Sequence, residues 1–218
     1  PCAVTNMTAI PYIDIHTHKV SGALDTIEVL NITPDDKCTG MASCGLHPWN
    51  VDCDWERAIE TVRNRAYETN IVLIGEAGID KICGTDIALQ IMAMEKQAII
   101  AEEVEKPMII HCVKGLDEII SIRKAVKARH RWIIHGFRGK PQSALQLTRN
   151  GFDISLGKMF NPETAKAIPL KCLWAETDET DADIRTVYRN IAEARGISVE
   201  ELKDSIYERF CEINTHKA

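Results

Sequence analysis

The chain has 218 residues, of which 45% are hydrophobic and 27% charged, and its formal net charge is −6. These values are ordinary for one globular domain spanning residues 1–218, and the negative charge argues against a protein that coats nucleic acid non-specifically. No apolar stretch is long enough to cross a bilayer, and residues 1–9 lack the regions of a signal peptide. The eight cysteines form no C-x-x-C pair. We therefore expect a cytoplasmic protein without membrane contact.

Eight short apolar runs are typical of buried strands, because they are rich in Ile, Val and Leu. Five of them end in residue types that bind metals: 12–18, 71–76, 107–111, 132–135 and 172–178. The other three lack such an ending: 26–32, 41–46 and 152–156. Parallel strands place their carboxyl ends at one edge of a sheet, so we expect the five endings to meet there.

Helical stripes of apolar residues alternate with these strands from about residue 40 onward. The stripes cover 55–66, 87–101, 119–126, 184–194 and 202–210. Asp54 and Asp86 are candidate N-caps, and Ser198 with Glu201 forms a capping box. Alternation of this kind predicts a (β/α)8 barrel, with a doubly wound open sheet as the alternative. We favour the barrel because metal-type residues follow both the first and the last strand, and only a closed sheet brings those strands together.

The first three strands are joined by unusually short segments, 19–25 and 33–40. Neither leaves room for a crossover helix, so we expect shortened connections, a thin wall and pairing that need not be parallel throughout. Strand 26–32 is apolar on both faces and requires a cover outside the barrel. The C-terminal helix around 202–210 is the first candidate. Residues 2–7 and a second subunit are the alternatives, so the expected state is a monomer or a weak homo-oligomer.

Six side chains at the strand ends are candidate metal ligands. They are His16, His18, Glu76, His111, His135 and Asp178. Each has a simpler explanation when taken alone: a histidine of the core, an acid in a salt bridge, or a helix cap. Four imidazoles and two carboxylates at one edge of a barrel are together better explained by a metal site.

Six stretches spread over nearly the whole chain match a known family. They are Asp14-Ile-His16-Thr-His18, Gly45-Leu-His47-Pro48, Ile74-Gly-Glu76-Ala-Gly78-Ile-Asp80, Pro107-Met-Ile-Ile-His111, Ile134-His135-Gly-Phe137-Arg-Gly139 and Glu176-Thr177-Asp178. On these motifs the chain resembles the TatD family of metal-dependent hydrolases, which belongs to the amidohydrolase superfamily of TIM barrels. Three segments depart from the family pattern, and one of them is the segment between the first and third strands, which is much shorter than in typical members. Glu179 to Asp181 replaces Ala-Pro-Tyr, and Gly136 to Lys140 replaces Cys-Phe-Ser-Gly, so the substrate rim is less well defined than the metal site.

The resemblance implies a deoxyribonuclease with two divalent metal ions, for which Zn, Mn, Mg and Ni all suit the donors. Its ligand scheme puts His16 and His18 on one ion, His111 and His135 on the other, Glu76 between the two, and Asp178 at the centre as ligand and base. Glu76 and Asp178 are thus candidate catalytic residues as well as ligands. The family also carries glutamines where this chain has Gln90 and Gln97.

Five further residues are candidates for substrate contact. Lys114, Arg138, Lys140 and Lys158 follow or end strands on the expected active edge, where they could bind phosphate oxygens of DNA or of a small phosphoester. His47 could contact the scissile phosphate or act as an acid, and a structural role for it is equally open.

Two alternative functions remain open from the sequence. The same scaffold supports hydrolysis of an amide or lactone, which fold and ligands alone do not distinguish from phosphoester hydrolysis. A carboxylate rather than a lysine at the bridging position, together with the basic rim, favours the phosphoester. The second alternative is a metal-stabilised barrel that binds a partner without turnover; the presence of all six ligands argues against it.

Overall fold

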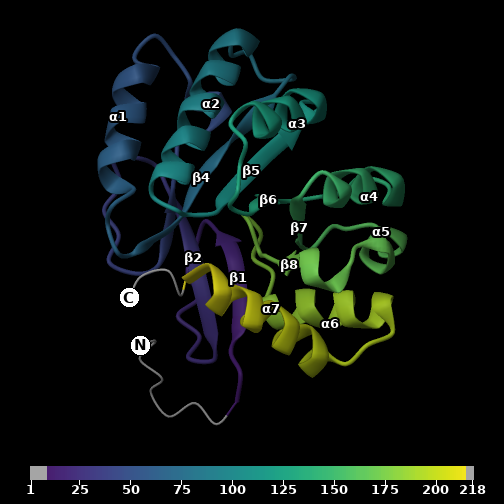
Figure 1. Ribbon diagram of the computed structural model, residues 1–218. Helices are drawn as coiled ribbons and strands as arrows, with labels where there is room; N and C mark the ends of the chain where they lie inside the picture. Colours follow the sequence, from purple (N-terminus) through teal and green to yellow (C-terminus); the bar gives the residue numbers. More distant parts are fainter. Residues whose placement is uncertain (1–8, 215–218) are drawn as a thin grey trace.

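The computed structural model describes residues 9–214, which form a parallel sheet wrapped by helices (Figure 1). Its strands are β1 (Tyr12–Thr17), β2 (Thr26–Ile32), β3 (Ala42–Cys44), β4 (Ile71–Asp80), β5 (Met108–Val113), β6 (Trp132–Ile134), β7 (Phe152–Leu156) and β8 (Leu173–Ala175). They pair in chain order, and every pair is parallel. The predicted (β/α)8 barrel is confirmed.

Helices follow the strands from β3 onward. They are α1 (Trp55–Arg65), α2 (Ile87–Glu103), α3 (Leu116–Ala125), α4 (Pro141–Arg149), α5 (Pro162–Ala167), α6 (Ile184–Arg195) and α7 (Val199–Asn214), with 3-10 turns η1 (Pro48–Asn50) and η2 (Leu170–Cys172). The Asp86 carboxylate caps α2, whereas Asp54 precedes α1 without a side-chain bond. None of the helices in the described part of the chain is long and apolar enough to cross a membrane.

The barrel closes between β1 and β8 at three of the candidate ligands, His16, His18 and Asp178. The backbone N–H of Asp178 donates to the carbonyl of His16 (3.0 Å), and the N–H of His18 donates to the carbonyl of Asp178 (3.1 Å). A parallel bridge also joins Thr17 to Asp178. The contacts that close the sheet therefore also bring His16, His18 and Asp178 together.

Farther down β1, the side chain of Tyr188 on α6 takes the place of the missing neighbouring strand. Its hydroxyl accepts from the N–H of Ile13 (3.1 Å) and donates to the carbonyl of Ile13 (3.0 Å), and the whole side chain is buried. One hydroxyl thus satisfies both backbone groups of a strand residue that β8 is too short to reach.

We expect Tyr188→Phe to lower the free energy of unfolding by about 2–3 kcal/mol, because both polar groups of Ile13 would stay buried without a partner. Urea denaturation followed by circular dichroism measures this loss. A change below about 0.5 kcal/mol would show that another group or water replaces the hydroxyl.

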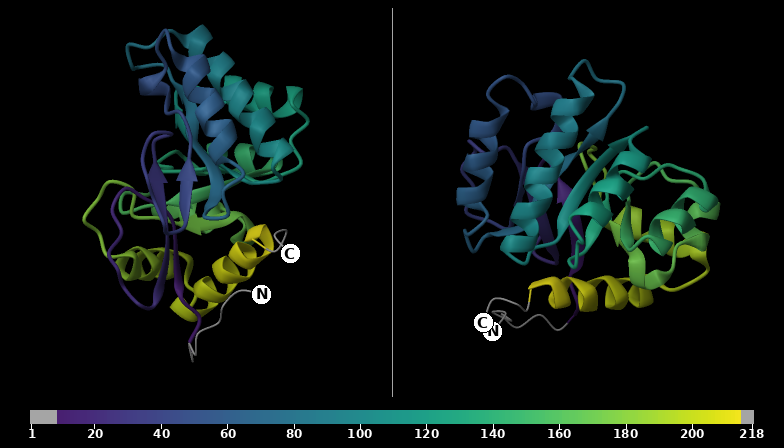
Figure 2. Two further views of the ribbon diagram at one scale, coloured as in Figure 1. Left: turned by 90° about the vertical axis from the view of Figure 1, so that its left-hand side faces the viewer. Right: turned by 45° about the horizontal axis from the view of Figure 1, so that its top comes forward.

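The corner with short connections is parallel like the rest of the sheet. Val29 is fully buried and Ile27 is half-buried against the core, as expected for a strand of the barrel wall. Helix α7 packs on α6 and on β1 rather than squarely over β2, and Figure 2 shows it crossing one end of the barrel. Residues 2–7, the alternative cover, lie outside the described residues.

Candidate metal centre

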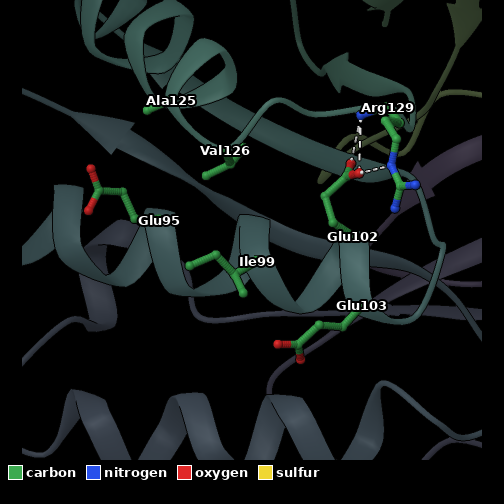
Figure 3. A pocket seen from close by; sticks show the side chains of 7 residues that line it. All are labelled: Glu95, Ile99, Glu102, Glu103, Ala125, Val126 and Arg129. Carbon is green, nitrogen blue, oxygen red and sulfur yellow. Dashed lines mark hydrogen bonds and ion pairs between the residues drawn. The ribbon is translucent and has the colours of Figure 1, made fainter.

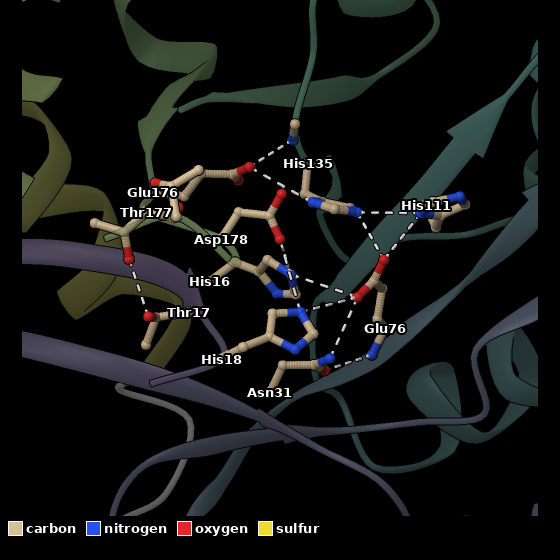
Figure 4. A network of polar contacts seen from close by, with 12 residues as sticks. His16, Thr17, His18, Asn31, Glu76, His111, His135, Glu176, Thr177 and Asp178 are labelled. Atoms are coloured by element: carbon tan, nitrogen blue, oxygen red, sulfur yellow. Dashed lines mark hydrogen bonds and ion pairs between the residues drawn. The ribbon is translucent and has the colours of Figure 1, made fainter. Parts of the chain in front are cut away.

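The six predicted ligands converge in one polar network at the carboxyl ends of the strands (Figure 4). Four overlapping groups of nitrogen and oxygen donors lie there, and the donor atoms of each group are within 4.8 Å of one another. They draw on His16, His18, His47, Glu76, His111, His135, Glu176 and Asp178. His111 and His135 point to the same side of the sheet, as a shared site requires.

Glu76 stands at the centre of the network, and its two oxygens face different histidines. The Oε2 atom lies 3.4 Å from Nε2 of His16 and 3.7 Å from Nε2 of His18. The Oε1 atom lies 2.7 Å from Nε2 of His135 and 3.0 Å from Nδ1 of His111. The carboxylate therefore joins two groups of ligands.

The first group is completed by Asp178. Its Oδ1 atom lies 3.6 Å from Nε2 of both His16 and His18. Separations of 3.4–3.7 Å are longer than hydrogen bonds. They match the about 3.4 Å between two ligands of one tetrahedral ion with bonds of about 2.1 Å. The first group has the spacing of a metal site.

The second group is more compact. Besides the contacts to Glu76, Nε2 of His135 lies 3.4 Å from Nδ1 of His111. His47 approaches from the η1 side, with its Nε2 atom 3.2 Å from Oε1 of Glu76 and its ring 4.5 Å from that of His111. Three imidazoles thus meet one carboxylate oxygen.

The donor atoms of the site fit a cation rather than a self-contained network. Both ring nitrogens of His16 are buried, and neither has a hydrogen-bond partner within residues 9–214. An unpaired buried polar atom costs about 1–3 kcal/mol, a cost that an ion bound at Nε2 removes. Imidazoles with carboxylates form the donor set of a divalent transition metal.

The network is strongly polarised in the metal-free protein. Burial lowers the pKa of His16, as does His135, but Asp178 and Glu76 outweigh both and raise it to about 9. Burial also lowers the pKa of His135, yet Glu76 and Glu176 hold it well above its usual range. Burial opposes ionisation of Glu76, whose pKa the histidines nevertheless hold far below its ordinary value. In the metal-free protein, protons on His16 and His135 therefore balance the negative charge of Glu76.

We expect metal affinity to rise with pH, because a metal must displace the protons on His16 and His135. The apparent affinity should increase about tenfold per pH unit for each displaced proton. The contribution of His16 to this increase should level off once the pH exceeds its pKa of about 9. Calorimetric titration with Zn²⁺ in buffers of different ionisation enthalpy measures both the affinity and the protons released. An affinity that stays constant from neutral pH to pH 9 would contradict the assignment of His16.

The stability of the metal-free fold should change with pH in the opposite direction, falling as the pH rises. His16 has a pKa of about 9 in the fold against a reference value of 6.5. It therefore contributes stability that is complete below pH 6.5 and is lost as the pH rises through about 9. Metal-free protein should unfold at lower urea concentrations at pH 9 than at pH 6.5, while zinc-loaded protein should not.

Several residues that were given no role from the sequence hold the ligands in place. Asn31 on β2 donates to Oε2 of Glu76 (3.2 Å) and accepts from its backbone N–H (3.1 Å). Glu176 accepts from the N–H of Gly136 (2.6 Å) and lies 3.5 Å from Nδ1 of His135. Position in a motif pointed to Glu176, whereas nothing local in the sequence marks Asn31.

The Asp178 loop is tied to β1 by a second pair of bonds. The backbone N–H and the hydroxyl of Thr177 donate to the Asp14 carboxylate at 3.0 and 2.6 Å. Burial raises the pKa of Asp14 to about 7, although these two donors oppose the shift. Asp178 itself has a φ of 56°, which is uncommon outside glycine and aims its carboxylate at the site.

Two hollows flank the network, and both are bordered by His111, His135 and Asp178. One, of about 510 Å³, is lined by Lys114 and Arg138 together with apolar residues of β5 to α4. The other, of about 410 Å³, is lined among others by His47, Trp49, Asp36 and Glu179. Lys140 and Lys158 are exposed, and neither lines these two hollows.

A further hollow of about 520 Å³ lies along α2, beside the end of α3 (Figure 3). It is lined by Ile99, Val126 and several glutamates, of which Glu102 pairs with Arg129 at 3.3 Å. None of the site residues borders it, so its volume alone gives it no role in the chemistry.

Known proteins resemble this chain in sequence and in fold. A metal-dependent hydrolase of Haemophilus influenzae is 26% identical over 69% of the chain and 62% of its own length. The deoxyribonuclease Tat-D of Schizosaccharomyces pombe is 23% identical over 72% of the chain and 56% of its length. The chain thus spans less than two thirds of either relative. The TatD homologue YJJV of Escherichia coli has the same fold, with a TM-score of 0.79, 17% identity and coverage of 93% of this chain and 97% of that one. The family model for TatD related DNases matches residues 19–214, and the chain belongs to that family.

Proposed function

We propose that this protein hydrolyses phosphodiester bonds in DNA with the help of two divalent metal ions. The observation that carries the proposal is the position of Glu76, whose two oxygens face two separate groups of histidines. The name of the Schizosaccharomyces pombe relative, a deoxyribonuclease, supports DNA as the substrate.

Each group of residues is assigned to one ion, according to which oxygen of Glu76 it faces. His16, His18 and Asp178 would hold the first ion with Oε2, and His111 and His135 the second with Oε1. Such a pair of ions activates water and stabilises charge on the attacking and leaving oxygens of a phosphoryl group.

Asp178 is placed to accept the proton of the attacking water. Burial opposes ionisation, but the neighbouring imidazoles of His16 and His135 keep the pKa of Asp178 below its usual value, so the carboxylate is charged at neutral pH. Its side chain is 25% exposed and borders both hollows. A charged, accessible carboxylate beside the ligands has the properties of a general base.

His47 and two cations are placed to bind the phosphate. The His47 ring borders the hollow that Asp178 also lines, with its Nε2 atom 3.2 Å from Oε1 of Glu76, and there it would hold a phosphate oxygen or protonate the leaving oxygen. Lys114 and Arg138 line the hollow on the other side and would bind neighbouring phosphates through charge-assisted bonds. The opposite hollow carries Asp36 and Glu179, so we expect the phosphates of a bound strand to extend mainly along the Lys114 side.

The proposal is tested by turnover of single-stranded DNA, a simple phosphodiester, a phosphomonoester and a cyclic amide. We expect cleavage of DNA and of the simple phosphodiester, reversible loss of activity on chelation, and restoration by Mn²⁺ or Zn²⁺. Turnover of the amide alone would establish the alternative chemistry. Metal binding without turnover of any of the four would establish the non-catalytic one.

Substrate contact is tested with Lys114→Gln and Arg138→Gln. Each should raise KM for DNA and weaken its dependence on salt, with a smaller effect on kcat. Lys124→Gln on α3 and Arg149→Gln on α4 remove matched exposed charges away from the site and serve as controls. Equal effects of the control and test variants would exclude a specific role for the two cations.

A further inference from the structure

Asp80 at the end of β4 contacts a candidate ligand from behind. It is 2% exposed, and its Oδ2 atom lies 3.2 Å from Nε2 of His111. The same oxygen accepts the indole N–H of Trp49 at 2.7 Å. The other oxygen accepts the backbone N–H groups of Ile82 (2.9 Å) and Cys83 (3.3 Å). Apart from His111, every described partner of this carboxylate is an N–H group that can only donate.

The opposite nitrogen of the same ring faces the metal centre. Nδ1 of His111 lies 3.0 Å from Oε1 of Glu76 and 3.4 Å from Nε2 of His135. A neutral imidazole carries one hydrogen, and a carboxylate can only accept. Asp80 therefore places that hydrogen on Nε2 and leaves the lone pair of Nδ1 directed at the second group of ligands.

The backbone of Asp80 is fixed as firmly as its side chain. The buried amide of Gln90 on α2 accepts from the N–H of Asp80 (2.8 Å) and donates to its carbonyl (3.0 Å). Trp49, in contrast, is 62% exposed and borders the hollow beside His47. A solvent-facing ring thus reaches, through one bond, the carboxylate behind His111.

We propose that Asp80 is a positioning residue that fixes His111 as an Nδ1 ligand, and that the indole N–H of Trp49 locks Asp80 in this role. The inference rests on the proposed binding of two ions, and concerns only the second of them. It makes Trp49 a link between whatever fills the adjacent hollow and the geometry of the metal site.

The first test is Asp80→Asn, measured with Zn²⁺ alone. The new amide has one oxygen for two sets of donors, so its NH₂ group must face either the backbone or Trp49 and His111. We expect a loss of about 10–100-fold in affinity for one of the two zinc ions, with the other unchanged, as measured by calorimetry. In ¹⁵N spectra of zinc-loaded wild-type protein, His111 should carry its hydrogen on Nε2, and the variant should lose that signal.

The second test is Trp49→Phe, which keeps an aromatic ring and removes only the N–H. It should weaken the same zinc ion, and by less than Asp80→Asn does. The control is Asp153→Asn, because Asp153 also accepts an indole N–H, that of Trp174 at 2.9 Å, at the start of β7. This control should lower stability and leave both zinc affinities unchanged.

The results distinguish the inference from the proposed function. If Asp80→Asn binds both zinc ions as tightly as the wild type, or if wild-type His111 carries its hydrogen on Nδ1, the positioning role is overturned even when DNA is cleaved. If the zinc affinities and spectra follow the expectation but no DNA is cleaved with any metal, the positioning role stands and the proposed substrate falls.

Discussion

Replacing Asp178 by asparagine is expected to lower kcat by about 10³-fold while leaving the fold intact. The asparagine has the same size but cannot accept the proton of the attacking water. Its backbone should be undisturbed, because asparagine is one of the few residues that tolerate a φ of 56°. The bonds that close the barrel between His16 and Asp178 use backbone atoms only and remain.

Three measurements on this variant separate catalysis from structure. Single-turnover cleavage of DNA gives the chemical step, urea denaturation gives the stability, and zinc titration gives the affinity of the first group. The control is Asp181→Asn, which neutralises an exposed acid three residues farther along that pairs only weakly with Lys19. Near-normal turnover of Asp178→Asn with both metals bound would exclude this residue as the base.

The barrel was predictable because its strands are continuous apolar runs, and these leave a plain signal in the sequence. Strands β2 and β7 begin and end at the predicted residues. Helices α4 and α5 were not predicted, because each is short and buries only two residues. Each begins with a proline, Pro141 or Pro162, which marks a helix start only in hindsight.

Strand β4 shows how a local signal can stop too early. The apolar run predicts a strand that ends at Glu76, yet the strand continues to Asp80 and is buried throughout. Gly78 permits this extension, because a Cβ at that position would lie 1.9 Å from the carbonyl oxygen of His111 on β5. The close approach brings Asp80 behind His111, a contact that no spacing along the chain announces.

The candidate site divides in the same way. Its candidate ligands lie at the ends of recognisable strands, so the sequence pattern predicts that their side chains meet. The residues that support them depend on distant pairings: Asn31 is 45 residues from Glu76, and Trp49 is 31 residues from Asp80. Only the register of β2, β4 and the η1 turn decides these contacts, and register was beyond the sequence pattern.

Replacing Glu76 by glutamine is expected to abolish activity and to affect the two proposed ions unequally. Asn31 donates to Oε2, so the oxygen of the new amide should occupy that place and its NH₂ group should face His111 and His135. The affinity for the second ion should therefore fall by more than about 100-fold, which is the upper end of the effect of losing a supporting contact. The first ion, which keeps an oxygen ligand beside His16, should lose less.

Zinc stoichiometry measured by calorimetry and equilibrium dialysis tests this asymmetry. The matched variants His18→Gln and His111→Gln each remove one ligand from one group and should each leave a single tight ion. Because the oxygens of Glu76 face both groups, only its replacement should disturb both affinities at once. Tight binding of two ions by Glu76→Gln would mean that the carboxylate is a structural partner of the histidines, and the two-metal proposal would then lose the observation on which it rests.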